Sequence, residues 1–246
     1  MEERNLKKEI SLFMATMLVC GNMIGSGVFM LPATLAQLSG PLATIIAWIL
    51  TSAGSILIAM SFANLGSKYP STGGAYQYTK IAFGEFAGFL SAWLYWNGSW
   101  IGNAAIIVAL SSYSAAVIPA LRDPLISIIY TSAILWFFTI INIIGVKKAG
   151  KIQTVATVFK IAFFAIFIIV ALINFDTVNI MPLLPQGKGL STISLAATST
   201  LWAFVGLESA TVTAGEIKNP EKNVRKSTIY GMIIASVIYM LISVAS

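Results

Sequence analysis

The sequence has no histidine, and Cys20 is the single cysteine among its 246 residues. Without histidine the chain lacks the side chain that most often binds metals and titrates near neutral pH, and one cysteine cannot form an internal disulfide. The sequence also shows no cluster of metal ligands and no pairing of a nucleophile with a base. We therefore expect neither a metal nor a cofactor, and the composition argues against an enzyme.

Charge is scarce as well, since Asp, Glu, Lys and Arg make up 10% of the chain, against about 25% in a typical soluble domain. Hydrophobic residues make up 57%, and they gather in long runs. Seven runs approach or exceed the roughly 20 residues that cross a bilayer. They span residues 10–36, 42–66, 84–117, 124–145, 151–173, 191–215 and 226–246. The first is too long for a signal peptide. Backbone polar groups in lipid must be paired internally, so we predict an all-α integral membrane fold of about seven helices.

The 15 basic residues are unevenly divided between alternate loops. Twelve precede the first run or lie in every second loop: Arg4, Lys7, Lys8, Lys68, Lys80, Lys147, Lys148, Lys151, Lys218, Lys222, Arg225 and Lys226. The other loops contain Arg122 and Lys188. Basic residues mark the cytoplasmic side of membrane proteins, so we predict a cytoplasmic N-terminus in a cytoplasmic (inner) membrane. Because they mark topology, we expect the lipid bilayer rather than nucleic acid as their surroundings.

Lys160 is the one basic residue in the middle of a predicted span. It lies nine residues beyond Lys151, which at 1.5 Å per residue is roughly 13 Å along the helix. A charge at a helix centre costs about 2.5–3.5 kcal/mol on insertion scales. Gln153, Thr157 and Lys160 follow i, i+4, i+7 spacing, so they share a helix face. The residues leave two roles open: a tether to the carbonyls of a neighbouring helix, or a charge that responds to protons or replaces a coupling cation.

Glu208 is the acidic residue that falls in the interior of a span, between Leu207 and Ser209 in the sixth run. Burial raises the pKa of a carboxyl group in general, so a buried glutamate can serve as a protonatable gate or coupling group. A structural carboxylate held by hydrogen bonds is the alternative. The residues do not decide between these two roles.

The first run contains three glycines within seven residues, Gly21, Gly25 and Gly27. Each weakens a helix by about 1 kcal/mol relative to alanine, which predicts an interruption at Gly25–Gly27. The second half-helix would then begin in the membrane and present free N–H groups to an anion, with the Ser26 hydroxyl as a further donor. Close helix packing is the alternative, because Gly21 and Gly25 form a small-xxx-small pair.

The sixth run contains one glycine, Gly206, four residues after Trp202. A break there would free carbonyls that accept hydrogen bonds from an ammonium group. Paired interrupted helices are the best sequence pointer to the binding site of a transporter. If the first break binds an anion and the second binds a cation, the site suits a zwitterionic amino acid. Trp202 could cover a cationic group or simply pack.

Several dispersed segments resemble the amino acid–polyamine–organocation permease superfamily, and within it the bacterial arginine/agmatine antiporter group. These segments are residues 21–29 (GNMIGSGVF), 71–76 (STGGAY), 83–84 (FG), 201–210 (LWAFVGLESA) and 218–220 (KNP). They occur in the family's order, and the likeness covers essentially the whole chain. The resemblance implies secondary active transport of amino acids, by antiport or proton-coupled uptake, with cationic ones such as arginine as the candidate substrates.

The resemblance also implies a fold of two inverted five-helix repeats and two further helices, with helices one and six interrupted. Residues 1–175 would then form the first repeat, and residues 176–246 would begin the second. On this basis we expect the chain to be the N-terminal portion, of about seven helices, of that fold. A truncated or split transporter half is the alternative, inactive without a partner chain. The partner would be a second copy in a homodimer or a complementary C-terminal half.

The resemblance assigns candidate site residues position by position. Those matching substrate-binding positions are Met23, Ser26, Gly27, Gly98, Ser99, Asn103, Trp202 and Val205. In the family the amides at Ser26 and Gly27 hold the substrate carboxylate, and the carbonyls at Met23, Trp202 and Val205 hold the amino group. Gly25 and Gly206 match the helix breaks. Glu208 matches a gating or proton-linked acid. Lys160 departs from the antiporter group and is similar to a lysine that replaces sodium in other members.

Overall fold

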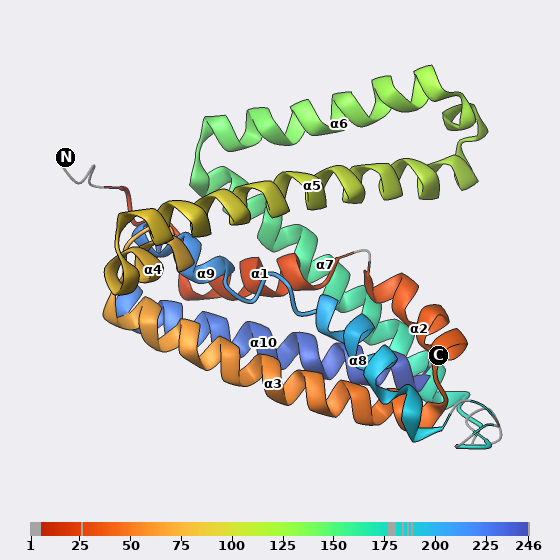
Figure 1. Ribbon diagram of the computed structural model, residues 1–246. Coiled ribbons are helices and arrows are strands. Elements are labelled where there is room, and N and C mark those ends of the chain that lie inside the picture. Colours follow the sequence, from red (N-terminus) through yellow and green to blue (C-terminus); the bar gives the residue numbers. More distant parts are fainter. Residues whose placement is uncertain are drawn as a thin grey trace. The chain divides into compact units, whose positions relative to one another are not determined.

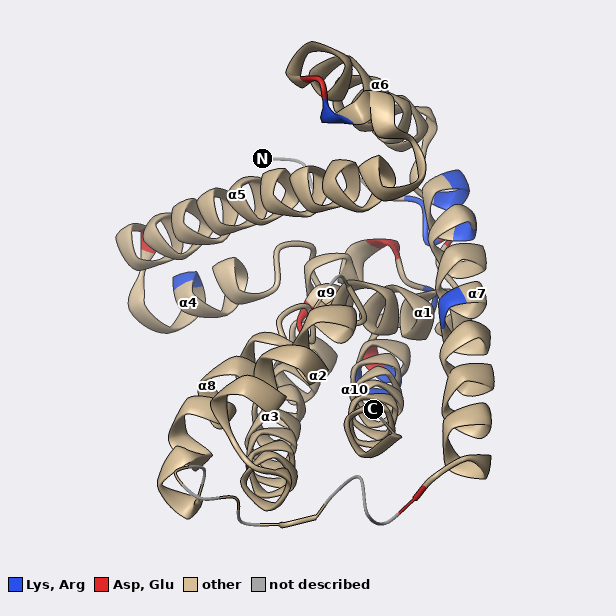
Figure 2. Cartoon of the chain, turned by 90° about the vertical axis from the view of Figure 1, so that its right-hand side faces the viewer, with Lys and Arg blue, Asp and Glu red and all other residues tan. Residues whose placement is uncertain are grey.

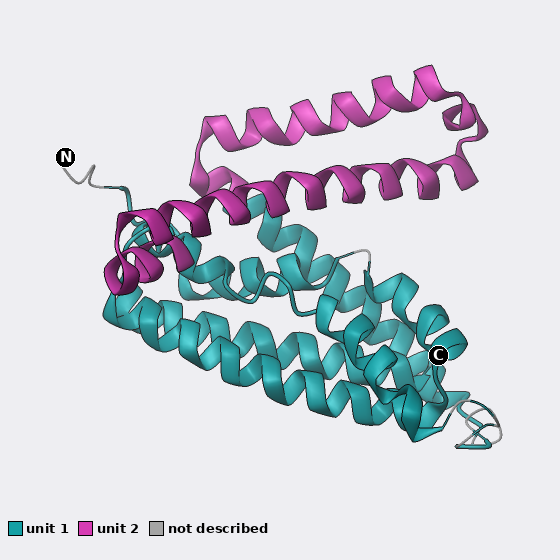
Figure 3. Ribbon diagram, viewed as in Figure 1, with its two compact units in different colours: residues 1–74, 150–246 teal, residues 75–149 magenta. Residues whose placement is uncertain are grey.

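The computed structural model describes residues 6–25, 27–176, 181–183, 185, 187 and 189–245. These residues form helices and connecting turns, and an isolated bridge between Ile10 and Ile217 is the only strand-like pairing among them. The chain divides into two compact units, residues 1–74 with 150–246, and residues 75–149 (Figure 3). The first unit combines segments from both predicted repeats. The repeat boundary near residue 175 stays a prediction.

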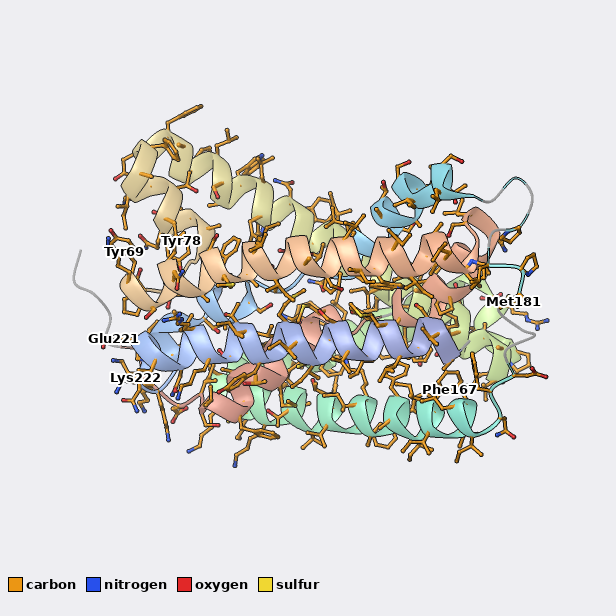
Figure 4. The ribbon with its side chains drawn as sticks, turned by 90° about the horizontal axis from the view of Figure 1, so that it is seen from below. Tyr69, Tyr78, Phe167, Met181, Glu221 and Lys222 are labelled. Carbon is orange, nitrogen blue, oxygen red and sulfur yellow. The ribbon has the colours of Figure 1, made fainter. Side chains whose placement is uncertain are left out.

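The first unit contains two long helices that lie side by side, α3 (Pro41–Lys68) and α10 (Pro220–Ala245) (Figure 1). They run antiparallel: Tyr69, just after α3, lies at the same end as Glu221 and Lys222 of α10, and Met181 lies at the opposite end (Figure 4). The Ser67 hydroxyl donates to the Glu221 carbonyl at that end. The remaining elements of this unit are α1 (Leu12–Met23), α2 (Gly27–Leu38), α7 (Val146–Ile173), η3 (Leu190–Thr192), α8 (Ile193–Trp202), α9 (Ser209–Val212) and η4 (Ala214–Glu216).

Small residues let these helices approach closely, as is common in membrane proteins. The buried positions of α3 include Ser52, Ser55, Ala59 and Ala63. Helix α1 packs on α10 at Gly231, where an added Cβ would lie 2.7 Å from the Val19 Cβ. Because no side chain fits there, glycine is what sets the distance between α1 and α10.

The second unit is a helical hairpin preceded by a short helix. It contains α4 (Ala75–Phe83), α5 (Glu85–Val117), η1 (Pro119–Arg122) and α6 (Pro124–Ile144). Asp123 caps α6 by accepting from the Leu125 and Ile126 amides at 2.9 and 3.1 Å, as N-cap residues do. Ser111 and Ser127 lie 2.6 Å apart, oxygen to oxygen, and join α5 to α6. Helix α4 was not predicted from the sequence.

Six helical segments of the described chain are long and apolar enough to cross a membrane, counting α1 and α2 together. They are Leu12–Leu38, Pro41–Lys68, Glu85–Val117, Pro124–Ile144, Val146–Ile173 and Pro220–Ala245. The seventh predicted run, 191–215, is divided among α8, a turn stretch and α9. Charged residues gather toward helix ends and loops, and most of each helix carries none (Figure 2). The all-α membrane fold with two interrupted helices is confirmed.

Candidate functional site

The first break separates α1 from α2. Helix α1 ends at Met23, and Ile24 leaves helical geometry with φ −75° and ψ 78°. The Ile24 amide still donates to the Cys20 carbonyl at 2.8 Å, whereas the Gly25 amide turns back to the Met23 carbonyl at 2.8 Å. Helix α2 resumes at Gly27. Its first amides have no helical acceptor. The predicted site residue Ser26 lies outside the described residues.

The carbonyls at the end of α1 are satisfied by a lysine from another helix. Lys160 Nζ on α7 donates to the Gly21 carbonyl at 3.0 Å and to the Ile24 carbonyl at 2.7 Å. The last carbonyls of a helix lack intrahelical partners and carry partial negative charge, so a lysine ammonium is a suitable partner. This geometry is that of a tether. Whether the lysine also takes part in ion coupling stays a prediction.

The glycines of the first break serve different purposes. A Cβ at Gly21 would collide with the side chains of Gln153 and Thr157, so Gly21 permits close contact between α1 and α7. Gly25 has only the Met23 carbonyl within 4 Å, at 3.9 Å, so it is not a packing glycine. Both sequence interpretations therefore apply, each to its own residue. Gln153, Thr157 and Lys160 all reach Gly21, as expected for one helix face.

The second break lies between α8 and α9. Residues 203–208 form turns, and Gly206 has φ +109°, a conformation that glycine adopts far more readily than other residues. A Cβ at Gly206 would lie 3.0 Å from the Cβ and the carbonyl carbon of Asn22. The Asn22 amide nitrogen donates to the Ser209 hydroxyl at 2.7 Å, and that hydroxyl donates to the Gly206 carbonyl at 2.6 Å. The second break is therefore held directly against the end of α1.

Glu208 lies at the end of this turn and is half-buried. Its carboxylate accepts from the Gly206 amide at 3.1 Å. Hydrogen bonding to the backbone fits the structural interpretation of this residue. A gating or proton-linked role is compatible with the same contact and stays a prediction.

Trp202 and Val205 face outward from the break, with 69% and 59% of their surfaces exposed. Phe204, between them in sequence, is 1% exposed and packs edge-on against Trp48, with 5.9 Å between ring centroids. Phe204 thus packs the turn against α3, whereas the Trp202 side chain stays exposed. An exposed indole beside freed backbone groups could receive a cationic side chain.

The remaining predicted site residues, Gly98, Ser99 and Asn103, lie on α5 in the second unit. All three are exposed there, and the Ser99 hydroxyl donates to the Tyr95 carbonyl of its own helix at 2.7 Å. Their membership of a substrate pocket stays a prediction.

Three residues that connect the breaks were not predicted from the sequence: Asn22, Ser209 and Tyr239. The Tyr239 hydroxyl on α10 donates to the Met23 carbonyl at 2.6 Å and to the Ala203 carbonyl at 3.0 Å. The available signal for Tyr239 was a polar group in an apolar helix, which Tyr230, Ser236 and Ser243 of the same helix share. Its partners could not be read from the sequence, because they are carbonyls freed by breaks in two other helices.

Comparison with known proteins gives a consistent picture. The sequence matches the family described as "Amino acid permease" over residues 10–246. It is 35% identical to a cadaverine/lysine antiporter of Escherichia coli K12, over 95% of this chain and 52% of that protein. It is 33% identical to an arginine/ornithine antiporter of Latilactobacillus sakei, over 99% of this chain and 53% of that protein. An arginine/ornithine antiporter of Pseudomonas aeruginosa is 31% identical, over 97% and 51%. The chain spans about half the length of these relatives.

Proposed function

Because the chain belongs to the amino acid permease family and is a multi-pass membrane protein rather than an enzyme, we propose that it binds an amino acid between its two helix breaks and carries it across the membrane. The observation that supports this proposal is the direct apposition of the breaks: Asn22 at the end of α1 touches Gly206 and donates to Ser209. The broken ends of two helices thus meet at one place within the first unit.

The two breaks have opposite electrostatic character. The first amides of α2 have no helical acceptor and form the positive end of a helix dipole, which favours a carboxylate. The ends of α1 and α8 carry partial negative charge on their carbonyls, which favours an ammonium group. A zwitterion satisfies both at once. We assign the carboxylate to the amides of Ser26 and Gly27, and the amino group to the carbonyls of Met23, Trp202 and Val205.

A cationic amino acid is the substrate class that this site favours. The named relatives exchange arginine for ornithine or cadaverine for lysine, according to their names. The exposed Trp202 side chain could cover a guanidinium or ammonium group, an interaction worth about 0.5–2 kcal/mol. By the family resemblance, Gly98, Ser99 and Asn103 stay our candidates for contact with the substrate side chain. We propose antiport, with proton-coupled uptake as the alternative.

Lys160 and Glu208 are our candidates for proton linkage. Lys160 already places an ammonium against the carbonyls of the first break, a place where a coupling cation could otherwise sit. Glu208 accepts from the amide of Gly206 in the second break. Loss of a proton from the Lys160 ammonium, or gain of one by the Glu208 carboxylate, would alter the hydrogen bonding of a break, which is how a proton could bias its movement.

We propose that the protein lies in the cytoplasmic membrane with its N-terminus in the cytoplasm. Because the chain spans about half the length of its relatives, its competence alone is open to test. The alternative is a transporter half that requires either a second copy or a complementary C-terminal half.

Uptake into proteoliposomes that contain this chain tests the proposal. Labelled arginine, lysine, ornithine and a neutral amino acid are offered, with and without a pH gradient and with unlabelled amino acid inside. Uptake that depends on the internal amino acid supports antiport, and uptake that depends on the gradient supports proton coupling. If Lys160→Ala and Glu208→Gln leave the pH dependence unchanged, these residues do not carry the linkage. If no amino acid enters or binds, the chain alone is not a transporter.

A further inference from the structure

We propose that a groove between the end of α3 and the start of α10 binds the phosphate headgroup of an anionic phospholipid. The phosphate lies against the first turns of α10, and an acyl chain follows the exposed face of the same helix. The inference does not rest on the proposed function, because the groove lies at the helix ends and contains none of the candidate substrate residues.

The groove has a volume of about 450 Å³, which is within the range of pockets that hold small molecules. Helix α3 contributes Ser67 to its lining, and the first three turns of α10 contribute the rest. The Ser67 hydroxyl donates to the Glu221 carbonyl and so joins the two helix ends beside the groove. Glu221 and Lys222 lie at this end of α10, close to Tyr69, which follows α3 (Figure 4).

Three cations on α10 line the groove, Lys222, Arg225 and Lys226. Their i, i+3, i+4 spacing places them on one helix face. All three are exposed, and in the part of the chain that the structure describes none of their side chains forms a salt bridge. Glu221 also lines the groove, so the three positive charges face one negative charge. This excess favours an anion, and arginine can bind a phosphate through paired N–H groups.

Further along α10 the same face becomes apolar. Ile229 and Tyr230 complete the lining of the groove. Side chains that are 38–49% exposed then follow at steps of three or four residues: Tyr230, Ile233, Val237 and Leu241. From Tyr230 to Leu241 the helix rises roughly 16 Å, about half of a hydrocarbon core of about 30 Å. Tyrosine is common where headgroups meet acyl chains. Cations followed by an apolar stripe one leaflet long match a phospholipid better than a free phosphate ion.

The combined variant Lys222→Gln, Arg225→Gln, Lys226→Gln tests the site. Glutamine removes the charges at exposed positions and keeps a good helix former. The probe is phosphatidylglycerol, and phosphatidylcholine serves as the phospholipid without net charge. Binding of each lipid to the purified full chain in neutral detergent is measured by native mass spectrometry, and thermal unfolding shows whether each variant is folded.

We expect each single substitution to weaken phosphatidylglycerol binding about fivefold, which corresponds to about 1 kcal/mol per basic residue near an anionic lipid. The combined variant should weaken it about a hundredfold on the same basis, and phosphatidylcholine binding should not change. If the combined variant does not fold, the single variant Lys226→Gln replaces it. Unchanged phosphatidylglycerol affinity would overturn the proposal and would favour a protein, such as a second copy of this chain, as the occupant of this face.

The start of α7 provides the control for overall charge. Lys147, Lys148 and Lys151 are exposed, and none of them lines the groove. Their combined replacement by glutamine removes the same charge and should change phosphatidylglycerol affinity by less than about twofold. Equal weakening by the two combined variants would overturn the proposal, because the lipid would then respond to net charge rather than to the groove.

Inorganic phosphate separates the two sources of the anion. A large excess of phosphate, at constant ionic strength, should leave phosphatidylglycerol bound to the wild-type chain, because phosphate has no acyl chain to lie along α10. Displacement of the lipid by phosphate would overturn the proposal in favour of a free phosphate site. Added sodium chloride should weaken phosphatidylglycerol binding more in wild type than in the combined α10 variant, because salt screens exposed charges. Equal salt dependence would contradict a role for these cations.

Discussion

In the second break, both the backbone conformation and the close contact with Asn22 require glycine at position 206. Its φ of +109° disfavours any residue with a side chain. A Cβ added at this position would also lie only 3.0 Å from the Cβ and the carbonyl carbon of Asn22. Backbone strain of this kind costs on the order of 1–3 kcal/mol. We expect Gly206→Ala to lower the free energy of unfolding by that amount, measured by thermal unfolding in detergent, and to abolish amino acid binding.

The control for Gly206→Ala is Gly54→Ala on α3. Gly54 has ordinary φ and no atom within 4 Å of an added Cβ, so alanine there should be neutral or should stabilise the helix by up to about 1 kcal/mol. If the two variants had equal stability, the strain assigned to Gly206 would be absent.

Glu216, in η4 outside the candidate spans, offers a pH test. Burial raises the pKa of its carboxyl group above the unfolded value of 4.5. The folded state therefore binds the proton more tightly, and its stability falls as the pH rises from about 4.5 through the folded pKa. Glu216→Gln mimics the protonated form, so it should match wild type at pH 4 and melt at a higher temperature at pH 8. A constant difference in melting temperature across this range would contradict the assignment.

At the residue scale, the sequence could predict which residues break the helices but not what holds the breaks. Gly25 and Gly206 were readable because glycine weakens a helix wherever it lies. Asn22 and Tyr239 were not, because their importance depends on carbonyls and hydroxyls brought together from distant segments. Lys160 could be singled out from the sequence, because a charge in an apolar run requires a partner. The carbonyls that accept its hydrogen bonds could not be predicted.

Among the elements, α7 is the one that anchors the end of α1, through Lys160. Replacement by methionine removes two hydrogen bonds, each worth about 1.5–3 kcal/mol with a charged donor. It also removes the cost of a charge in the span, about 2.5–3.5 kcal/mol. These effects oppose each other, so we expect little change in the global melting temperature.

The local effect of Lys160→Met should be large, because the Gly21 and Ile24 carbonyls lose their donor. We expect amide exchange across residues 21–27 to rise by about tenfold. Lys151→Met, an exposed lysine on the same helix, should leave that exchange unchanged. Equal exchange in the two variants would mean that Lys160 does not tether the break.

Gly21 sets how closely α1 and α7 approach. A side chain there would collide with Gln153 and Thr157, and overpacking of this kind costs about 1–3 kcal/mol. We expect Gly21→Val to lower the free energy of unfolding by at least that amount in a thermal or urea titration. Gly102→Ala on α5, where nothing lies within 4 Å, provides the comparison and should be neutral.

The sequence located the elements well where hydrophobic length defined them. The runs predicted at 42–66 and 84–117 correspond to α3 and α5 within two residues at each end. Helix α4 was missed because it is nine residues long and contains Lys80, so it has neither the length nor the apolarity of a span. The division of the chain into two units depends on packing between distant segments and left no local signal.

At the scale of the whole molecule, the distribution of basic residues and the packing agree on one end of the first unit. The Ile10 amide donates to the Glu216 carbonyl at 3.0 Å, and the Lys218 amide donates to the Ile10 carbonyl at 2.9 Å. Lys7 and Lys8 therefore join the segment that leads into the basic first turns of α10. The Ser67 contact with Glu221 brings Lys68 to the same end. This concentration is what the positive-inside rule associates with the cytoplasm.

Single cysteines can test that orientation, because the native Cys20 is buried and can be replaced by alanine as background. In right-side-out vesicles, a membrane-impermeant maleimide should label Arg122→Cys and should not label Lys148→Cys or Lys222→Cys. Permeabilised vesicles should label all three, since these positions are exposed. Labelling of Lys222→Cys from outside would reverse the orientation, and the sides assigned to both breaks would be exchanged with it.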